Sequence, residues 1–391
     1  MTNPVDTCDG LDRTSRPAPA VDLPADVPAL QMFYLYLSAG CNLHCRHCWI
    51  TPTLVNGAPA AAECIDFELL KAAVAEAKPM GLSAAKLTGG EPLLHPEFLQ
   101  IIDFLAAENL SITMETNATL IDRDTAFRIR QTEKFAHIAV SIDSADPGRH
   151  DLLRGLRGAF DAAVRGFGHM VEAGFRPQII MSVDRENVDD IEALIELALS
   201  LGAGSVKFNP VSASGRGAEL HRQGKTLGFD ELLELSHRIR GPLQDRYPVH
   251  LSLMIPAALL TAKELLRYGG DGGCCNVRHI LGILGTGELA LCGIGRNIPE
   301  LCFGMLGRDS VREVWTTHPA LRQMRQDLAG TLPGLCGDCI HAGRCQTHCM
   351  AMNYEEAGKL VNVSPLCAEA QRRGKFPATR RVSWGREHPA A

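Results

Sequence analysis

The chain has 391 residues, enough for two domains or one large domain with an extension, and its net charge of −6 gives no sign of bulk nucleic-acid binding. No apolar run approaches the length that crosses a membrane, and the first residues lack the apolar core of a secretory signal. We therefore expect a cytoplasmic protein with no nucleic-acid or membrane partner.

The fourteen cysteines indicate metal binding rather than disulfides, because the cytosol keeps thiols reduced. Three of them lie at positions 41–48 and nine lie between positions 274 and 367, whereas Cys8 and Cys64 stand apart. This distribution divides the chain into a front catalytic region and a cysteine-rich back region.

In the front region, short apolar runs alternate with helical patterns. The runs predict strands at residues 32–37, 85–88, 111–114, 137–142, 178–183 and 205–208. The patterns between them predict helices at residues 66–78, 96–108, 122–131, 159–173 and 188–201, and glycines at 81, 174 and 202 suit helix C-caps. Such alternation is typical of a parallel sheet, and six strands favour a partial (β/α)6 TIM-like barrel over the alternative of a doubly wound sheet.

Residues 211–270 show a weaker pattern. A loop is predicted at residues 214–217, and helices are predicted at residues 230–246 and 256–268. We therefore expect a flexible N-terminal arm at 1–28, a core barrel at 29–225, bridging helices at 226–270, a cysteine-rich domain at 271–372 and a basic tail at 373–391.

Polar groups follow each predicted strand at the point where it ends. In a βα barrel these ends share one face, which carries the functional groups. The first set is the loop Cys41-Asn42-Leu43-His44-Cys45-Arg46-His47-Cys48. Its C-x3-C-x2-C spacing suits three ligands of a cubane iron–sulfur cluster whose fourth iron stays open, since such clusters normally take four cysteines. The alternative is a structural zinc site, which the lone triplet fits poorly because zinc takes four ligands.

This loop resembles the signature of the radical SAM superfamily. The resemblance implies a [4Fe–4S] cluster on Cys41, Cys45 and Cys48, with S-adenosylmethionine (SAM) on the open iron. In this family an electron from the cluster cleaves SAM to a 5′-deoxyadenosyl radical.

The remaining strand ends fit the same resemblance. Gly89-Gly90-Glu91-Pro92 resembles the family's GGEP motif, whose glycines would let a ligand approach and whose carboxylate or carbonyl would accept from the SAM ammonium. His47 would lie near the adenine, and Ser141 and Asp143 resemble a Ser-x-Asp motif suited to ribose hydroxyls. Arg154 would pair with the SAM carboxylate, unless it or Asp143 belongs to a surface ion pair. Asn117, which follows the third strand, completes the expected cofactor contacts.

The back region resembles the SPASM extension of radical SAM enzymes, which carries two auxiliary [4Fe–4S] clusters. The pattern runs through Cys274-Cys275, Gly287-x4-Cys292, then C-x2-C-x5-C-x3-C, and a final cysteine. The resemblance assigns the outer cluster to Cys336, Cys339, Cys345 and Cys367. It assigns Cys349, Cys292 and Cys275 or Cys274 to the inner cluster, which either the adjacent cysteine or the substrate would complete. Cys302 is a further ligand or a buried thiol, and paired zinc knuckles are the rival interpretation.

The combined resemblance implies a radical SAM/SPASM oxidoreductase of the peptide-maturase type. Such an enzyme would oxidatively modify a ribosomally made peptide, with a crosslink as the expected product. Sulfatase-maturing relatives carry an aspartate, thought to act as a base, where this chain has Gly293, so formylglycine formation is not expected.

Several partners follow from this reading. We expect an electron donor such as flavodoxin or ferredoxin. About thirty residues precede the first predicted strand, too few for a leader-binding domain. The barrel and extension would therefore bind the peptide themselves, or a separate leader-peptide-binding protein would deliver it. The alternatives are radical chemistry on a small molecule or tetrapyrrole, peptide epimerisation, and a non-enzymatic metal-binding role.

Overall fold

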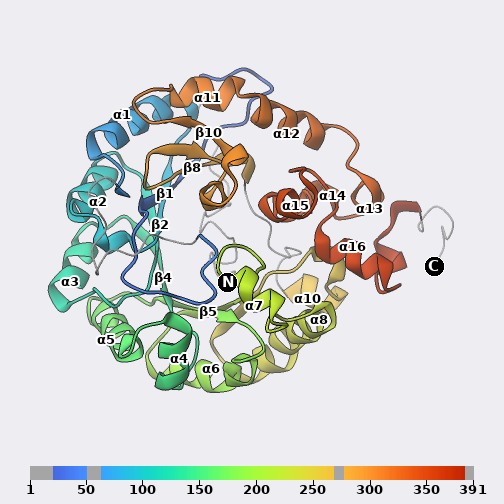
Figure 1. The fold of residues 1–391 in the computed structure, drawn as a ribbon, viewed down its shortest axis with the longest axis horizontal. Coiled ribbons are helices and arrows are strands. Elements are labelled where there is room, and N and C mark those ends of the chain that lie inside the picture. The colour runs from blue at the N-terminus through green and yellow to red at the C-terminus, as the bar shows by residue number, and fades with distance from the viewer. Residues whose placement is uncertain (1–20, 51–62, 268–276, 384–391) are drawn as a thin grey trace.

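The centre of the molecule is one ten-stranded sheet that curves into a partial barrel with helices around its outside (Figure 1). The structure is a computed structural model and describes residues 21–50, 63–267 and 277–383. The strand order is β10-β9-β8-β1-β2-β3-β4-β5-β6-β7. Pairing is parallel from β8 to β7 and antiparallel for β8 with β9 and β9 with β10.

The six predicted strands of the front region are confirmed. They are β1 (Met32–Ser38), β2 (Ala84–Gly89), β3 (Ser111–Thr116), β4 (Phe135–Ser141), β5 (Gln178–Val183) and β6 (Ser205–Pro210). Every residue of β1 is buried, as expected for a central strand of a parallel sheet that is covered on both faces. The predicted partial barrel is thereby confirmed as well.

The five predicted helices of this region are also confirmed. They are α1 (Phe67–Ala77), α2 (Phe98–Ala107), α3 (Arg123–Gln131), α5 (Ala159–Glu172) and α6 (Ile191–Ser200). Aspartate caps begin two of them, because Asp66 accepts from the Leu69 amide and Asp122 from the Thr125 amide. The predicted glycine stops at 81, 174 and 202 have left-handed φ values of 104°, 88° and 77°.

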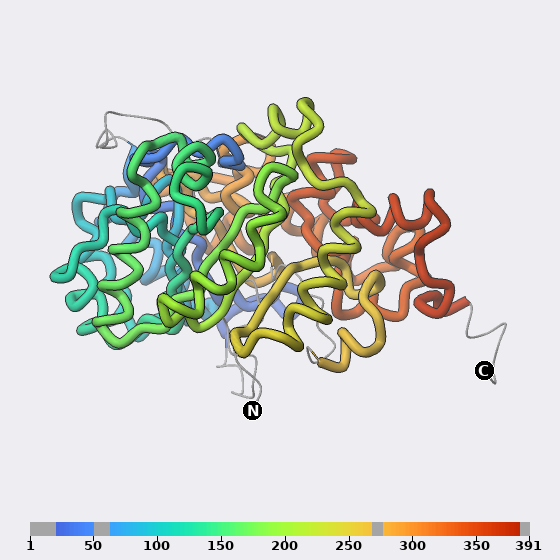
Figure 2. The backbone as a smooth tube through the Cα atoms, turned by 90° about the horizontal axis from the view of Figure 1, so that it is seen from below, coloured from blue at the N-terminus to red at the C-terminus, as the bar shows by residue number. Residues whose placement is uncertain are grey.

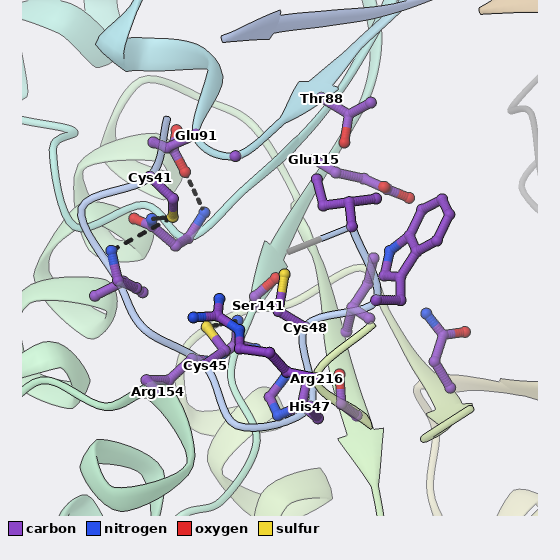
Figure 3. Close-up of a pocket in the computed structure, with 18 of the residues that line it drawn as sticks. Cys41, Cys45, His47, Cys48, Thr88, Glu91, Glu115, Ser141, Arg154 and Arg216 are labelled. Carbon is purple, nitrogen blue, oxygen red and sulfur yellow. Dashed lines mark hydrogen bonds between the residues drawn. The ribbon is translucent and has the colours of Figure 1, made fainter. Parts of the chain in front are cut away.

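Two short helices beside the barrel mouth were not predicted. They are α4 (Pro147–Arg154) and α7 (Gly217–Arg222). The first begins where Asp146 accepts a hydrogen bond from the Arg149 amide, and it ends at Gly155 in the left-handed conformation. Helix α4 therefore places Arg154 in its last turn, pointing toward the cysteine loop (Figure 3).

The segment expected to contain only bridging helices also contributes a strand to the barrel. The predicted helix at 230–246 is present as α8 (Phe229–Arg238), a π-helical turn (Ile239–Leu243) and α9 (Gln244–Arg246). It leads into β7 (His250–Leu253), which pairs parallel with β6. The prediction of one helix over 256–268 is wrong, because residues 257–259 form a 3-10 turn before α10 (Ala262–Arg267).

The back region adds three strands beside β1 and then a group of helices. Strands β8 (Ile280–Ile283), β9 (Glu288–Ala290) and β10 (Cys302–Met305) extend the sheet. The helices are α11 (Val311–Thr317), α12 (Pro319–Ala329), α13 (Gly334–Gly337), α14 (Ala342–Cys345), α15 (Met350–Ala357) and α16 (Pro365–Arg372). Figure 2 shows the last of these, in red, at one side of the barrel.

Specific contacts fix the back region to the barrel. Trp315, which is fully buried, donates from Nε1 to the carbonyl of Pro28 at 2.9 Å. The Glu76 carboxylate on α1 accepts from the amides of Val311 and Arg312 at 3.0 and 3.1 Å and so caps α11. Within the described residues, no helix has both the length and the apolar character needed to cross a membrane.

Candidate active site at the carboxyl ends of the barrel strands

A cavity of about 1010 Å³, part of it open to solvent, lies where the barrel strands end. The loop after β1 and the ends of the strands from β2 to β6 line it (Figure 3). The predicted ligand residues that the structure brings together here are Cys41, Cys45, His47, Cys48, Gly89, Gly90, Glu91, Asn117, Ser141 and Arg154. Of the predicted cofactor contacts, Asp143 alone is not part of the lining.

Hydrogen-bond donors face the sulfur atoms of this loop. Asn117 Nδ2 lies 3.9 Å from Cys41 Sγ, and Arg154 Nη1 lies 3.7 Å from Cys45 Sγ. Burial, followed by the charge of Glu91, raises the pKa of Cys41 to about 12, and burial also raises the pKa of Cys45 against the effect of Arg154. Thiolates at such a site need a positive partner, which metal ions of a cluster supply. The residues present therefore fit a three-cysteine iron–sulfur site.

The glycine pair of the second strand end faces the chain's own backbone. An added Cβ on Gly90 would lie 1.9 Å from the carbonyl oxygen of Gly40, and Gly89 has a left-handed φ of 128°. The Gly90 amide donates to Ser38 and the Glu91 amide donates to Gly40. The glycines are thus needed so that this loop and the cysteine loop can touch, which differs from the expectation that they make room for a ligand.

Glu91 is committed to a structural role. Its Oε1 accepts from Thr116 Oγ1 at 2.7 Å and its Oε2 accepts from the Asn117 amide at 2.8 Å. Burial raises the pKa of Glu91 to about 7 against these hydrogen bonds. The carboxylate therefore joins the end of β3 to the loop after β2.

Asp143 and Arg154 form an ion pair that is buried, not exposed. Arg154 Nη2 donates to Asp143 Oδ1 at 2.9 Å, its Nε lies 2.7 Å from Oδ2, and the Ser182 amide also donates to Oδ1. Burial opposes the charge on Asp143, yet Arg154, His47 and His150 together hold the pKa of the carboxyl below its usual value. Asp143 is therefore paired within the protein here, and its contact with ribose hydroxyls stays a prediction.

His47 lies against the same ion pair. Its Nε2 is 3.6 Å from Asp143 Oδ2. Burial lowers the pKa of His47 to about 4, because the nearby arginines offset the attraction of Asp143. The ring is consequently neutral and planar at pH 7, as suits stacking on a base.

Arg216 is a lining residue that the sequence analysis missed. Its Nε and Nη2 are buried and find no hydrogen-bond partner within the described parts of the chain. Its backbone amide donates to the carbonyl of Cys48 at 2.9 Å, so the loop after β6 closes over the cysteine loop. The available signal was its place in Ser214-Gly215-Arg216-Gly217, shortly after the sixth strand ends. This cation can bind an anionic group in the cavity.

A second, smaller cavity of about 360 Å³ gathers the cysteines predicted for the outer auxiliary cluster. These are Cys336, Cys339, Cys345 and Cys367. Burial, and then the proximity of the other three cysteines, raises the pKa of Cys367. Positions 31 residues apart in the chain thus line one cavity.

Two of the cysteines predicted for the inner cluster are also neighbours. Burial raises the pKa of Cys292 to about 12, and the nearby Cys349 adds to the rise. Cys274 and Cys275 lie outside the described residues. Cys302 has its Sγ 3.5 Å from the carbonyl oxygen of Gly295 and lines neither of these two cavities.

The segment between Cys345 and Cys349 has an unusual backbone. Gln346, Thr347 and His348 have φ values of 47°, 68° and 70°, which side chains other than glycine rarely adopt. In a right-handed helix, residues four apart share one face. The left-handed turn breaks that relation, and so Cys345 lines the second cavity while Cys349 approaches Cys292.

The donor arrangement does not resemble a site for a single ion. Among residues 21–50, 63–267 and 277–383, no group of three or more His, Cys, Asp or Glu could hold one metal ion. A single zinc ion needs its ligand atoms within about 2.3 Å of one point. A cubane cluster instead spreads its ligands over separate irons.

Residues 35–198 match the family model of the radical SAM superfamily. Among curated proteins, the AdoMet-dependent heme synthase of Methanosarcina barkeri is 27% identical over 341 residues, which cover 85% of this chain and 94% of that protein. The mycofactocin maturase MftC of Mycolicibacterium smegmatis is 27% identical over 342 residues, which cover 85% of this chain and 81% of that protein.

Among solved structures, Streptococcus suis SuiB bound to its precursor peptide SuiA superposes with a TM-score of 0.66 at 16% identity. The match covers 88% of this chain and 76% of SuiB. At this identity the likeness shows a shared fold.

Proposed function

Since this chain contains a radical SAM domain and is a radical SAM enzyme, we propose that it cleaves SAM reductively and uses the resulting radical to oxidise a ribosomally made peptide. The expected modification is a crosslink. The observation that carries the proposal is the set of three buried or half-buried cysteines that line one cavity with the polar ends of five further strands.

The cluster site is proposed from Cys41, Cys45 and Cys48. A [4Fe–4S] cluster held there would supply the electron that splits SAM into methionine and a 5′-deoxyadenosyl radical. The protein's own part is to hold the loop. Asn117 and Arg154 donate toward the sulfurs, and the Gly90–Gly40 contact fixes the loop against the neighbouring strand end.

The SAM contacts are proposed from the remaining lining residues. Arg216 pairs with the SAM carboxylate. Two of its guanidinium nitrogens are buried in the lining, and no acceptor among the described residues bonds to them. Arg154, the other lining arginine, already donates to Asp143. Backbone carbonyls beside Glu91 accept from the ammonium. His47 stacks near the adenine and Ser141 contacts the ribose.

Two auxiliary [4Fe–4S] clusters are proposed in the back region. The four cysteines around the second cavity hold the outer one, and their meeting around one cavity supports this. Cys292 and Cys349, with Cys274 or Cys275, hold the inner one. The left-handed turn at 346–348 supports the assignment of Cys345 and Cys349 to different clusters. It lets Cys345 line the second cavity while Cys349 approaches Cys292.

The substrate is proposed from relatives. MftC is by name the maturase of mycofactocin, and SuiB has been solved with a precursor peptide. We propose a flavodoxin or ferredoxin as electron donor and, if the barrel does not bind the peptide unaided, a separate leader-binding protein. A tetrapyrrole substrate is the second candidate, because the heme synthase relative is as similar in sequence as MftC.

The test uses reduced enzyme, SAM and the short peptides encoded beside the gene, with intact-mass and fragmentation analysis. A peptide lighter by one hydrogen pair, with a gap in its fragment ladder, is the expected result. An unchanged mass with deuterium gained from solvent would indicate epimerisation instead. Turnover of a tetrapyrrole with no change in any neighbouring peptide would refute the peptide substrate and leave SAM cleavage intact.

A further inference from the structure

Glu115 places a partly exposed carboxylate in the cavity, away from the cysteine loop's ion pair. It is the residue before the last of β3, and 33% of its side chain is exposed. In Figure 3 it lies near Thr88, on the side of the pocket opposite Arg154 and His47. Its Oε1 accepts from Lys86 Nζ at 2.7 Å. Within the described chain, no hydrogen bond reaches Oε2.

The other acid–base groups of the lining are already engaged. Both oxygens of Glu91 accept hydrogen bonds from the end of β3, and Glu91 is 1% exposed. His47 lies against the buried Asp143–Arg154 pair, with its Nε2 3.6 Å from Asp143 Oδ2. Apart from the cysteines, Glu115 is therefore the group in the described lining that is anionic and can still accept a proton from a ligand.

The surroundings of Glu115 keep it ionised. Burial opposes its charge, but Lys86 on β2, Lys207 on β6 and His137 on β4 together lower the pKa of the carboxyl. These groups face it from the strands packed around the barrel interior. Glu115 is thus a carboxylate throughout the neutral range, in a site whose positive neighbours offset its charge.

Glu115 also lies between the two cysteine regions. Lys86, its ion-pair partner, lies with Nζ 5.1 Å from the centre of the Tyr34 ring on β1. Tyr34 pairs with Gly282 on β8, where an added Cβ would lie 3.0 Å from the Cα of Cys292. The Glu115–Lys86 pair therefore lies on the side of the cavity that is nearest to Cys292. A substrate that fills the cavity would lie against Glu115 and between both redox centres.

We propose that Glu115 is the catalytic proton acceptor of substrate oxidation. The inference rests on the proposed function. The 5′-deoxyadenosyl radical removes a hydrogen atom from a substrate C–H bond, giving 5′-deoxyadenosine and a carbon radical. One electron would pass to a [4Fe–4S] cluster held by the back-region cysteines, and one proton passes to Glu115 Oε2 as the new bond forms. The substrate has then lost two hydrogens. The cluster would give its electron to the oxidised form of the proposed flavodoxin or ferredoxin, and Glu115 would release its proton to solvent.

The test compares wild type with Glu115→Gln, Glu115→Asp and a matched control, Glu68→Gln, whose carboxylate is 79% exposed on α1. The probe is a uniformly deuterated peptide that wild type oxidises. Two quantities are measured, deuterium transfer into 5′-deoxyadenosine and oxidised peptide formed per 5′-deoxyadenosine. A second measurement uses cluster-free protein with carbon-13-labelled glutamate carboxyls. The NMR signal that is missing in Glu115→Gln is assigned to Glu115, and its titration with pH is followed in wild type.

We expect Glu115→Gln to keep deuterium transfer while oxidised peptide per 5′-deoxyadenosine falls about 100-fold, the usual loss for a missing general base. Glu115→Asp restores part of the coupling, and Glu68→Gln behaves as wild type. The NMR signal should titrate below the ordinary glutamate range, and wild-type coupling should fall as pH drops through that value. This acid limb should be absent in Glu115→Gln.

Wild-type coupling in Glu115→Gln would overturn the inference, as would a Glu115 signal that titrates above pH 7. Equal loss of deuterium transfer in the Gln and Asp variants would also overturn it, because the residue would then position the cofactor. Failure of wild type to form any 5′-deoxyadenosine would refute the proposed function itself, which is a different result.

Discussion

Gly293 lies against the ring of Tyr36, so closely that an added Cβ would be 2.4 Å from Tyr36 Cε1 and 2.5 Å from the phenol oxygen. The glycine directly follows Cys292, and Tyr36 belongs to β1. The space into which a side chain at position 293 would project is therefore filled by a tyrosine from β1. Packing alone thus excludes a carboxylate at this position without movement of the ring.

Substitution at this contact should lower stability. We expect Gly293→Ala to lower the free energy of unfolding of the cluster-free protein by about 1–3 kcal/mol, because it overpacks a buried ring. Gly168→Ala is the control, since nothing lies within 4 Å of its added Cβ and alanine favours its helix. Denaturant unfolding measures both, and equal stability of the two variants would contradict the packing argument.

The iron content should report the three proposed clusters. Anaerobically reconstituted protein should hold about 12 irons per chain, and the triple Cys41/Cys45/Cys48→Ala variant should lose about 4 of them. Cys64→Ala is the control and should keep the full content, because Cys64 lines neither cysteine cavity. Iron and zinc analysis decides the matter, and stoichiometric zinc without iron would exclude the cluster assignment.

Removal of the Arg216 guanidinium should weaken SAM binding. A lost hydrogen bond between charged groups costs about 1.5–3 kcal/mol, so we expect the dissociation constant of SAM to rise by about 10- to 150-fold in Arg216→Met. Arg216→Lys should recover part of the affinity. The control is Arg222→Met, whose side chain is 72% exposed on α7. Equilibrium binding to cluster-loaded protein measures the effect, and unchanged affinity in Arg216→Met would remove this residue from the SAM site.

Much of the barrel was predictable because its strands are continuous apolar runs separated by helical patterns. Strand β7 was not predicted, since its four residues His-Leu-Ser-Leu bury one face and are too short to stand out. Strands β8 to β10 were not predicted. Strand β8 pairs with β1, which lies more than 240 residues earlier in the chain, and the local sequence pattern does not reveal a pairing over that distance.

The candidate site was predictable where the residue type itself determines chemistry, as for the cysteines. It was not predictable where the partner decides the role. Asp143 was assigned to a ligand, but Arg154 engages it. Arg216 was read as loop, because only the fold brings its unpartnered guanidinium to the cavity.

Relief of the left-handed turn should stabilise the back region. A non-glycine residue in this conformation costs about 1 kcal/mol, so we expect Gln346→Gly to raise the free energy of unfolding of cluster-free protein by up to about 1 kcal/mol. Gln323→Gly, in the interior of α12, is the opposite control and should lower stability by about 1 kcal/mol. Paired denaturant titrations test this, and a loss of stability in Gln346→Gly would show that the turn is held by contacts of its side chain.

The pairing of β1 with β8 has a consequence for how the protein is made. Met32 lies opposite Ile280, so one edge of the first strand has no partner until roughly 240 further residues have been synthesised. At ribosomal rates of about 5–20 residues per second, that edge waits about 10–50 s. The strand is apolar along most of its length, and an open edge of this kind pairs readily with other nascent chains. A polypeptide that stops before residue 280 keeps this edge permanently exposed and is a template for aggregation.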